Sequence, residues 1–303
     1  MVKGVLCSLT SALMFSFLYF LVTFMAPLGG LELVAIRSAL LVPALAIMIL
    51  MMGTWGQVRE LVRRIQENWL FIFIPLSTAA LVAFLQWLFF WAPLNGHALD
   101  VSLGFFLLPL MMVFWGRVAY HEKITRYKGL AIALAVIGVS NMIWRSGGVS
   151  YPALGIALGY IVYFAIRKKF TMNTLGALLM ETVFIFPLAI FLIVQGWPLL
   201  TTAFAVNEKI VWVLPLFAVV SLLSLSTYIL ASEYLSMSVF GLLCYIEPLL
   251  LFGVALYVGE SLKEGEMYSF VCLILALGVL AAEGIQALRT TQLLRQGNAV
   301  KAG

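Results

Sequence analysis

ELVAIRSALLVP, residues 32–43, and LLMETVFIFP, residues 178–187, are apolar segments in which one charged residue stands six positions before a proline. Arg37 and Pro43 in the first segment correspond to Glu181 and Pro187 in the second, both at an offset of 144 residues. A second pair, SLGFFLLPLMMVFWGRVAYHE (102–122) and GLLCYIEPLLLFGVALYVGE (241–260), aligns at offsets of 139 and 138. Chance explains one such match between apolar segments more readily than two. We interpret the matches as an internal duplication with small loop gaps.

Composition places both copies in a membrane. Of the 303 residues, 64% are hydrophobic and 10% are charged, too few charges to cover a soluble surface. A bilayer core of about 30 Å needs about 20 residues per helix. Charges, glycines and prolines then divide the chain into ten predicted spans: 5–26, 31–52, 69–92, 99–118, 129–144, 152–166, 174–195, 210–232, 237–258 and 267–287.

The distribution of basic residues predicts the orientation of these spans. With the termini in the cytoplasm, cytoplasmic segments hold fourteen of the 18 Lys and Arg, whereas Arg145, Lys209 and Lys263 lie outside and Arg37 lies within a span. Cytoplasmic loops of membrane proteins carry the excess of Lys and Arg. We therefore expect a multi-pass protein of the cell inner (plasma) membrane with both termini cytoplasmic. The net charge of +5 follows from this topology and gives no sign of nucleic-acid binding.

The repeat and the span count together predict the architecture. A unit of five spans is odd in number, so its second copy enters the membrane from the opposite side. We expect an all-α integral membrane protein with a first five-helix repeat at 1–146, a second, inverted repeat at 147–288, and a cytoplasmic tail at 289–303. Inverted repeats are a recurrent plan of secondary transporters, whose binding sites lie near the bilayer midplane between the repeats.

Sequence motifs for catalysis or cofactors are missing. Cys7, Cys244 and Cys272 lack metal-ligand spacing, and two histidines are too few for a metal site. The sequence also contains no phosphate-binding loop, no dinucleotide fingerprint and no HExxH. We predict no cofactor, no metal and no enzymatic activity. The expected partners are a small-molecule substrate and the lipid bilayer, and dimerisation with a second copy is left open.

Several segments resemble the RarD branch of the EamA, or drug/metabolite transporter, superfamily. They are WAPLNGHALDVSLGFFLLPL (91–110), AIRKKF (165–170), LLMET (178–182) and SEYLSMSVFGLLCYIEP (232–248), and the resemblance extends over residues 4 to 287. It implies ten helices in two inverted halves, a central cavity, and export of small metabolites or drugs, with chloramphenicol attached by name to this branch. Glu247 departs from the branch pattern and is more similar to the LEP motif of the wider superfamily.

Glu247 is the first candidate for a functional residue. It lies about ten residues into the ninth predicted span, where an ionised carboxylate costs several kcal/mol unless it is paired or hydrated. Pro248 follows it and cannot donate to the carbonyl of Cys244, so a main-chain acceptor is freed nearby. Glu247 is then either a proton-coupling carboxylate or a ligand for a cationic group; a protonated Glu packed against a neighbouring helix is the alternative.

Arg37 and Glu181 are the other charges deep in predicted spans, and with Asp100 they are the candidate gate residues. Arg37 is expected to reach Asp100 or Glu32 near the outer surface, and Glu181 to pair with Arg167 or a lysine. A pair that breaks on opening gives a gate, whereas a permanent pair only holds helix ends together.

Polar and aromatic residues complete the predicted substrate or proton pathway. Its members are Glu247, Pro248, Gln86, Trp87, Tyr228, Tyr245 and Ser102. Amide and indole donors beside aromatic faces suit an amphipathic solute. By contrast, Gly155 and Gly159 form a GxxxG pattern that predicts close helix packing.

The predicted function is a secondary transporter, most simply an exporter, that moves small amphipathic metabolites or drugs by alternating access, with proton coupling as an option. A channel-like facilitator is one alternative, because hydroxyls and a few charges can also line a pore. An integral membrane enzyme that modifies lipids is the other, and it needs clustered catalytic residues that the sequence does not offer.

Overall fold

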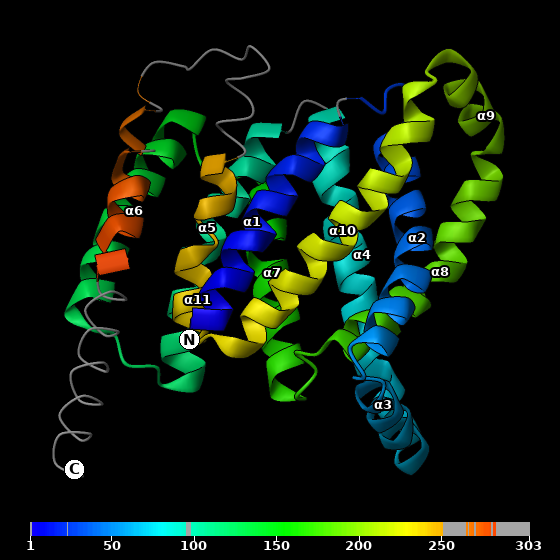
Figure 1. The fold of residues 1–303 in the computed structure, drawn as a ribbon. Coiled ribbons are helices and arrows are strands. Elements are labelled where there is room, and N and C mark those ends of the chain that lie inside the picture. Colours follow the sequence, from blue (N-terminus) through cyan, green and yellow to red (C-terminus); the bar gives the residue numbers. More distant parts are fainter. Residues whose placement is uncertain are drawn as a thin grey trace, which may run out of the picture.

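The computed structural model describes residues 2–22, 24–94, 98–250, 265, 267–269, 271–279 and 281–282. In these residues the regular structure is entirely helical. The named helices are α1 (Val2–Val22), α2 (Gly30–Met51), α3 (Gly56–Glu67), η1 (Trp69–Ile72), α4 (Phe73–Leu94), α5 (Ala98–Tyr120), α6 (Arg126–Ser146), α7 (Tyr151–Lys169), α8 (Leu175–Gln195), α9 (Trp197–Val206), α10 (Lys209–Tyr234) and α11 (Met237–Leu243). A further apolar helix covers Met267–Val279 (Figure 1).

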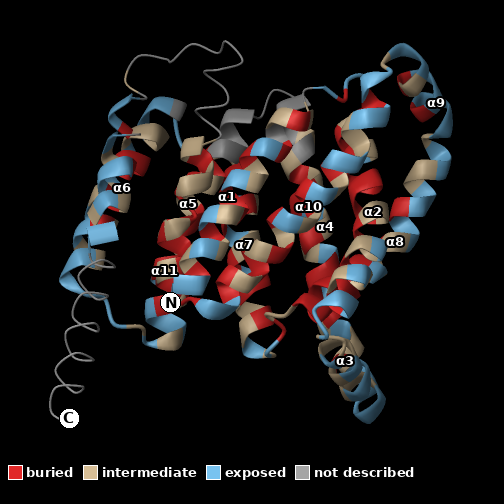
Figure 2. Cartoon of the chain, viewed as in Figure 1, coloured by how far each residue is buried: buried red, intermediate tan, exposed pale blue. Residues whose placement is uncertain are grey.

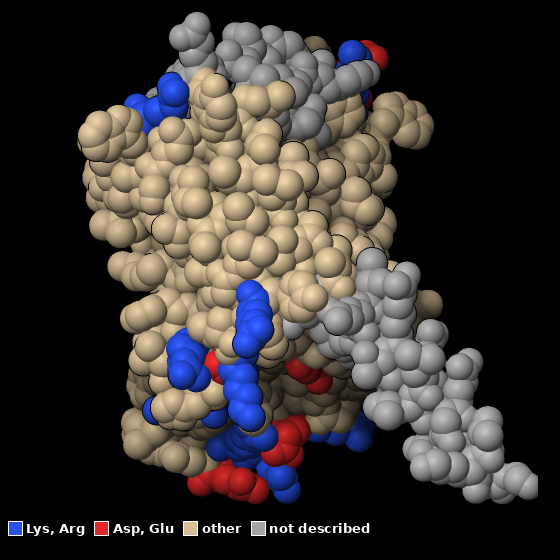
Figure 3. Space-filling model, turned by 90° about the vertical axis from the view of Figure 1, so that its left-hand side faces the viewer, with Lys and Arg blue, Asp and Glu red and all other residues tan. Residues whose placement is uncertain are grey.

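Within that part of the chain, seven helices are long and apolar enough to cross a membrane. These segments are Val2–Val22, Gly30–Met51, Trp69–Phe89, Leu103–Tyr120, Arg126–Arg145, Leu175–Gln195 and Lys209–Tyr234. One face of the molecule shows a broad band without charged side chains among its described residues, and the charged side chains gather mainly at its lower end (Figure 3). The chain is therefore a multi-pass membrane protein, as its composition predicts.

The core lies where helices from distant parts of the chain meet. Helix α1 packs against α10, α2 against α8, and α5 against both α7 and α11. Buried residues face these contacts, whereas α6 and α8 turn many exposed apolar side chains outward (Figure 2). An apolar exterior is what lipid chains require of a membrane protein.

Glycines allow the closest of these contacts. A Cβ on Gly159 of α7 would lie 2.7 Å from a methyl carbon of Leu85 in α4, and one on Gly155 would lie 3.2 Å from Leu88. The GxxxG pattern therefore packs α7 against α4, and the prediction of a close packing contact is confirmed.

Two segments expected to be loops are helices. Arg59, Arg63 and Arg64 lie in α3, an amphipathic helix that buries Leu61 and turns its charges outward. Helix α9 occupies most of the segment between the seventh and eighth predicted spans and has Pro198 in its first turn. Span prediction looks for long apolar runs and so misses helices of this length.

Short polar residues set the helix boundaries. The hydroxyls of Thr125, Ser150 and Thr174 accept hydrogen bonds from main-chain N–H groups at the starts of α6, α7 and α8. Helix α6 ends at Gly147, whose φ of 77° is the left-handed conformation that glycine adopts at little cost. This end coincides with the predicted boundary between residues 146 and 147.

Candidate functional site

Helix α11 is broken in front of Glu247. The helix ends at Leu243, the chain turns at Cys244 and Tyr245, and helical structure resumes from residue 246 to residue 250. Pro248 explains the position of the break, because it has no N–H to donate to the carbonyl of Cys244. The sequence predicts one span at 237–258; its described part, Met237–Leu250, is apolar and helical on both sides of this turn, and residues 251–258 lie outside the described residues. Broken helices commonly form the binding sites of transporters.

Aromatic rings from four helices meet beside this break. We call Phe15 of α1, Phe164 of α7, Tyr228 of α10 and Phe240 of α11 the aromatic cluster. The ring centroid of Tyr228 lies 5.7 Å from that of Phe15, 5.5 Å from that of Phe164 and 5.0 Å from that of Phe240. Edge-to-face and tilted rings at these distances attract one another beyond simple area burial. The cluster thus joins both halves of the chain in one apolar wall.

Tyr228 links the aromatic cluster to the segment that carries Glu247. Its hydroxyl lies 3.6 Å from the sulfur of Cys244, three residues before Glu247. Tyr160 of α7 stacks on Phe164 at 6.4 Å and interacts electrostatically with Glu247. Glu247 itself makes no ion pair with any described residue.

Arg37 faces the same interior from α2. Its side chain is 3% exposed, and its guanidinium carbon lies 5.8 Å from the ring centroid of Phe15. Nε and Nη2 are buried and make no hydrogen bond within the described part of the chain. The charges of Arg37 and Glu247 attract each other electrostatically, yet no ion pair joins them. A buried cation and a carboxyl group thus face one interior without direct contact.

The predicted partners of Arg37 are not observed with it. Glu32 lies near the start of α2 and makes no ion pair with Arg37, although both side chains are described. That part of the expectation is wrong, because the guanidinium points into the core rather than toward the helix end. Asp100 belongs to α5, but its side chain lies outside the described residues, as does that of Ser102.

The remaining pathway residues divide between two environments. Tyr228 belongs to the aromatic cluster. Tyr245 is fully buried but packs with Phe106, Val113 and Leu273 in another core cluster, because the turn directs it to the opposite side of the segment. Gln86 is buried on α4, with no described partner for its side-chain oxygen. Trp87 continues a row of rings along the same helix, 5.8 Å from Phe84 and 5.5 Å from Trp91.

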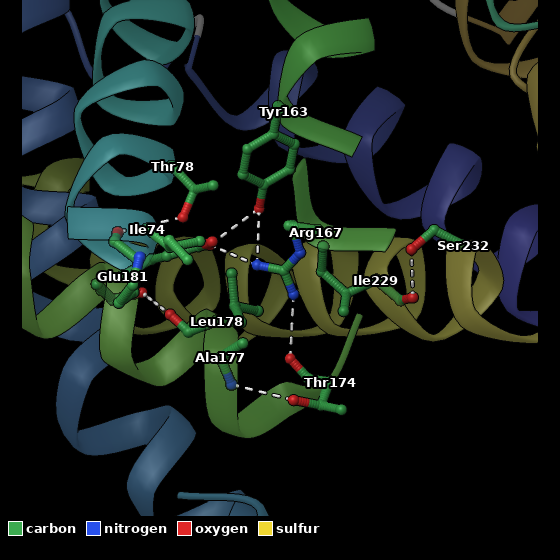
Figure 4. Close-up of polar contacts among 12 residues, drawn as sticks. Ile74, Thr78, Tyr163, Arg167, Thr174, Ala177, Leu178, Glu181, Ile229 and Ser232 are labelled. Atoms are coloured by element: carbon green, nitrogen blue, oxygen red, sulfur yellow. Dashed lines mark hydrogen bonds and ion pairs between the residues drawn. The ribbon is translucent and has the colours of Figure 1, made fainter. Parts of the chain in front are cut away.

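Glu181 pairs with Arg167, and this predicted contact is confirmed. Its Oε2 accepts hydrogen bonds from Arg167 Nη1 at 2.5 Å and from the Tyr163 hydroxyl at 2.9 Å (Figure 4). Nη2 of Arg167 also donates to the carbonyl of Thr174 at 3.1 Å. All four residues belong to α7, α8 and the turn between them. The pair therefore joins two consecutive helices, so a role in gating requires α7 and α8 to move together.

Glu122 connects three helices at the end of the molecule that holds the N-terminus. Its two carboxylate oxygens accept from the main-chain N–H groups of Met237 at 2.8 Å and Ser238 at 2.9 Å, at the start of α11. Lys168 near the end of α7 approaches it to 3.5 Å. Partial burial acts to raise the pKa of Glu122, but the hydrogen bonds from Ser238 and Met237 and the charge of Lys168 outweigh it and lower the pKa.

Three members of the aromatic cluster and the neighbouring Tyr160 are absent from the sequence-based prediction. Phe15, Tyr160, Phe164 and Phe240 stand among many aromatics in apolar spans, where no local pattern separates a ring that faces a polar centre from one that faces lipid. Phe15 lies beside Arg37, Tyr160 stacks on Phe164, and Phe164 and Phe240 meet at Tyr228; only the packed structure provides these contacts.

Relatives identify the chain as a transporter. A family model described as the EamA-like transporter family matches residues 2–144. A Pasteurella multocida protein named as an uncharacterized transporter is 36% identical over 290 residues, covering 95% of this chain and 99% of the relative. The chloramphenicol-sensitive protein RarD of Pseudomonas aeruginosa is 34% identical, covering 95% of this chain and 96% of that protein.

A solved structure supports the fold alone. This crystal structure matches 91% of the chain and 96% of its own length with a TM-score of 0.65, at 13% sequence identity. The helix packing is thus shared with a distant protein, and the sequence matches of over 30% extend over nearly the whole chain. From these similarities together with the apolar helices, the protein is a membrane transporter that belongs to the EamA-like transporter family, as a RarD-like member.

Proposed function

We propose that the protein is a secondary exporter of small amphipathic solutes that works by alternating access between two inverted five-helix repeats, residues 1–146 and 147–288. The termini are cytoplasmic and the membrane is the cell inner membrane. The match of the family model to residues 2–144, close to the first repeat, agrees with this division.

The helix contacts support the repeat. The 144-residue offset pairs α2 with α8, and the order of the helices then pairs α1 with α7, α4 with α10 and α5 with the α11 segment. If each helix is replaced by its counterpart in the other repeat, the contact between α1 and α10 becomes the contact between α7 and α4. In the same way, the α5–α7 contact becomes the α11–α1 contact, and the α4–α8 contact becomes the α10–α2 contact. Each of these contacts occurs, and the α2–α8 and α5–α11 contacts map onto themselves. Such a pattern is expected of a pseudo-two-fold axis.

The position of Glu247 is the observation that supports the proposed mechanism most directly. A carboxyl group that follows a break in its helix, faces Arg37 and the aromatic cluster, and has no described ion partner has little purpose in an inert core. An apolar residue there would be more stable by a few kcal/mol. We assign Glu247 to proton coupling or to binding a cationic group of the solute. Pro248 keeps the carbonyl of Cys244 free nearby.

The test compares the wild type with Glu247→Gln in proteoliposomes. Chloramphenicol is one probe, since the P. aeruginosa relative is named for sensitivity to it. The other probe is a panel of solutes found by comparing metabolites of cells with and without the protein. If Glu247 carries protons, flux driven by a pH gradient falls at least tenfold in the variant, whereas solute exchange without a gradient persists. If Glu247 binds a cationic group, affinity falls only for cations.

A matched control comes from the same half of the chain. Glu233→Gln alters an exposed carboxyl group near the end of α10 and is expected to leave flux unchanged. Unchanged flux of every probe in Glu247→Gln at all pH values would contradict the assignment of Glu247. Flux that rises linearly with solute concentration without saturation would instead support the channel-like alternative.

A further inference from the structure

Arg37 differs from the other buried arginine of the described chain. Arg167 is also inaccessible, but it forms an ion pair with Glu181 and donates to Tyr163 and Thr174. Arg37 is 3% exposed and has no ion pair with any described residue; the ring of Phe15 lies beside it, and Tyr160 and Glu247 act on it only through electrostatic interaction. A guanidinium in a membrane interior normally satisfies its donors with acceptors. The interior around Arg37 therefore lacks an acceptor that its chemistry demands.

The unpartnered atoms of Arg37 define the chemistry of that acceptor. Nε and Nη2 form one edge of the guanidinium plane, with parallel N–H groups. This edge fits the two oxygens of a carboxylate, which accept both hydrogen bonds at once. Glu247 does not occupy it, because no ion pair joins the two side chains.

The surroundings of Arg37 add the second half of the ligand. Phe15 lies directly beside the guanidinium, and through Tyr228 it is continuous with Phe164 and Phe240. These rings offer an apolar surface to the part of a solute that is attached to its carboxylate. Glu247 is near enough to interact electrostatically with Arg37 and offers an acceptor for an amine.

We infer that Arg37 binds the carboxylate of the transported solute, so that the substrate class is an organic acid or zwitterion with an apolar body. The inference rests on the proposed transport function and specifies its substrate. The two solute types share the carboxylate and differ in whether an amine also engages Glu247.

The experiment measures binding of three probes with one carbon skeleton to the purified full-length protein in nanodiscs. The probes are 4-methylpentanoate, its uncharged amide, and leucine, which adds an amine to the acid. We expect the wild type to bind at least one of the two carboxylates tenfold or more tightly than the amide. Tighter binding of leucine than of 4-methylpentanoate indicates the zwitterion, and the reverse order indicates the simple acid.

Variants of Arg37 then test the residue itself. Arg37→Gln is expected to bring the ratio of carboxylate to amide affinity close to one, with amide binding unchanged. Arg37→Lys keeps the positive charge but lacks the two parallel N–H groups, so we expect a carboxylate-to-amide affinity ratio between one and that of the wild type. This variant also tests the inference if Arg37→Gln fails to fold. Arg63→Gln, which removes an exposed guanidinium paired only within α3, is the control and should match the wild type.

Two outcomes would overturn the inference. The first is a wild type that shows no preference for either carboxylate over the amide. The second is an Arg37→Gln variant that keeps the full wild-type ratio of carboxylate to amide affinity while the flux of all solutes falls equally. If Arg37→Gln does not fold, the same result in Arg37→Lys counts instead. That result would assign Arg37 to a gate. A preserved binding preference without any flux in proteoliposomes would refute the transport mechanism and leave the carboxylate site in place.

Discussion

At the scale of single residues, two buried arginines show how the same side chain serves different ends. Arg167 has its acceptors supplied by Glu181, Tyr163 and Thr174, all in the α7–α8 hairpin. Arg37 has two donors, Nε and Nη2, that are buried and left unpaired among described residues. Among described residues, Arg167 leaves only Nε without an acceptor, whereas Arg37 leaves both Nε and Nη2 without one, and we take that larger deficit as the mark of the solute site proposed above.

Loss of Glu181 is expected to destabilise the protein. Glu181→Gln removes the charge that compensates Arg167 and leaves a buried cation, at a cost of about 3 kcal/mol in the free energy of unfolding. The double variant Arg167→Met/Glu181→Leu removes both charges and should recover most of that loss. Thermal unfolding in detergent measures both effects. Glu60→Gln, in an exposed ion-paired network of α3, is the control and should leave the melting temperature unchanged. Equal melting temperatures for all variants would contradict a structural role for the pair.

At the scale of elements, α11 is a short helix whose two ends are fixed by different means. Its start is held by the Ser236 hydroxyl and by the carboxylate of Glu122, which reaches it from the end of α5. Its end is imposed by Pro248, which removes a main-chain donor. The element therefore lies between Glu122, just after the end of α5, and the turn that precedes Glu247.

The contact between Glu122 and α11 is expected to weaken in acid. The pKa of Glu122 is lower in the folded protein than its ordinary value of 4.5, so its stabilisation is complete above that value and is lost as the pH falls through the folded pKa. Hydrogen exchange at the amides of Met237 and Ser238 measures this, as a protection factor that declines below about pH 4.5. Glu122→Gln should show low protection at every pH, and Lys168→Met should retain most of it. Protection in Glu122→Gln equal to that of the wild type would refute the cap.

At the scale of the whole molecule, the main helix contacts have counterparts when the two halves of the chain are exchanged. In the mechanism that we propose, opening on one side of the membrane would therefore resemble opening on the other. Helix α3 is fixed to the second half through Arg64, which donates to the carbonyl of Phe170 at 3.0 Å. At the opposite end, the side chain of Asn207 donates to the carbonyls of Phe24 and Ala26 at 2.9 and 2.7 Å. The alternating access that we propose would have to break these contacts in turn.

The orientation of this molecule is open to a labelling test. Single cysteines replace Val149, between α6 and α7, and Val62, on α3, in a variant without Cys7, Cys244 and Cys272. Both positions are exposed, at 39% and 41%. With cytoplasmic termini, an impermeant thiol reagent added outside intact cells should label position 149 and not position 62, and both should react after lysis. The reverse pattern would invert the proposed topology.

The amino-acid sequence by itself determined the class of the protein. Hydropathy is a local property of the chain, so the apolar composition predicts a helical membrane protein, and the paired segments around Arg37 and Glu181 predict the repeat that we propose. The contact of Glu181 with Arg167 could also be predicted, because a short hairpin brings the two residues together. Family membership rested likewise on the sequence, through motifs spread over nearly the whole chain.

Only the tertiary structure decided which side chains meet. A helix carries residues on every face, and its rotation is set by packing against helices far away in the chain. Packing therefore placed Arg37 beside Phe15 rather than Glu32, turned Tyr245 away from Tyr228, and brought Glu122 to α11. Apolar patterning does not encode those rotations, since lipid and protein interior are equally apolar, and so the candidate site appears only when the helices are assembled.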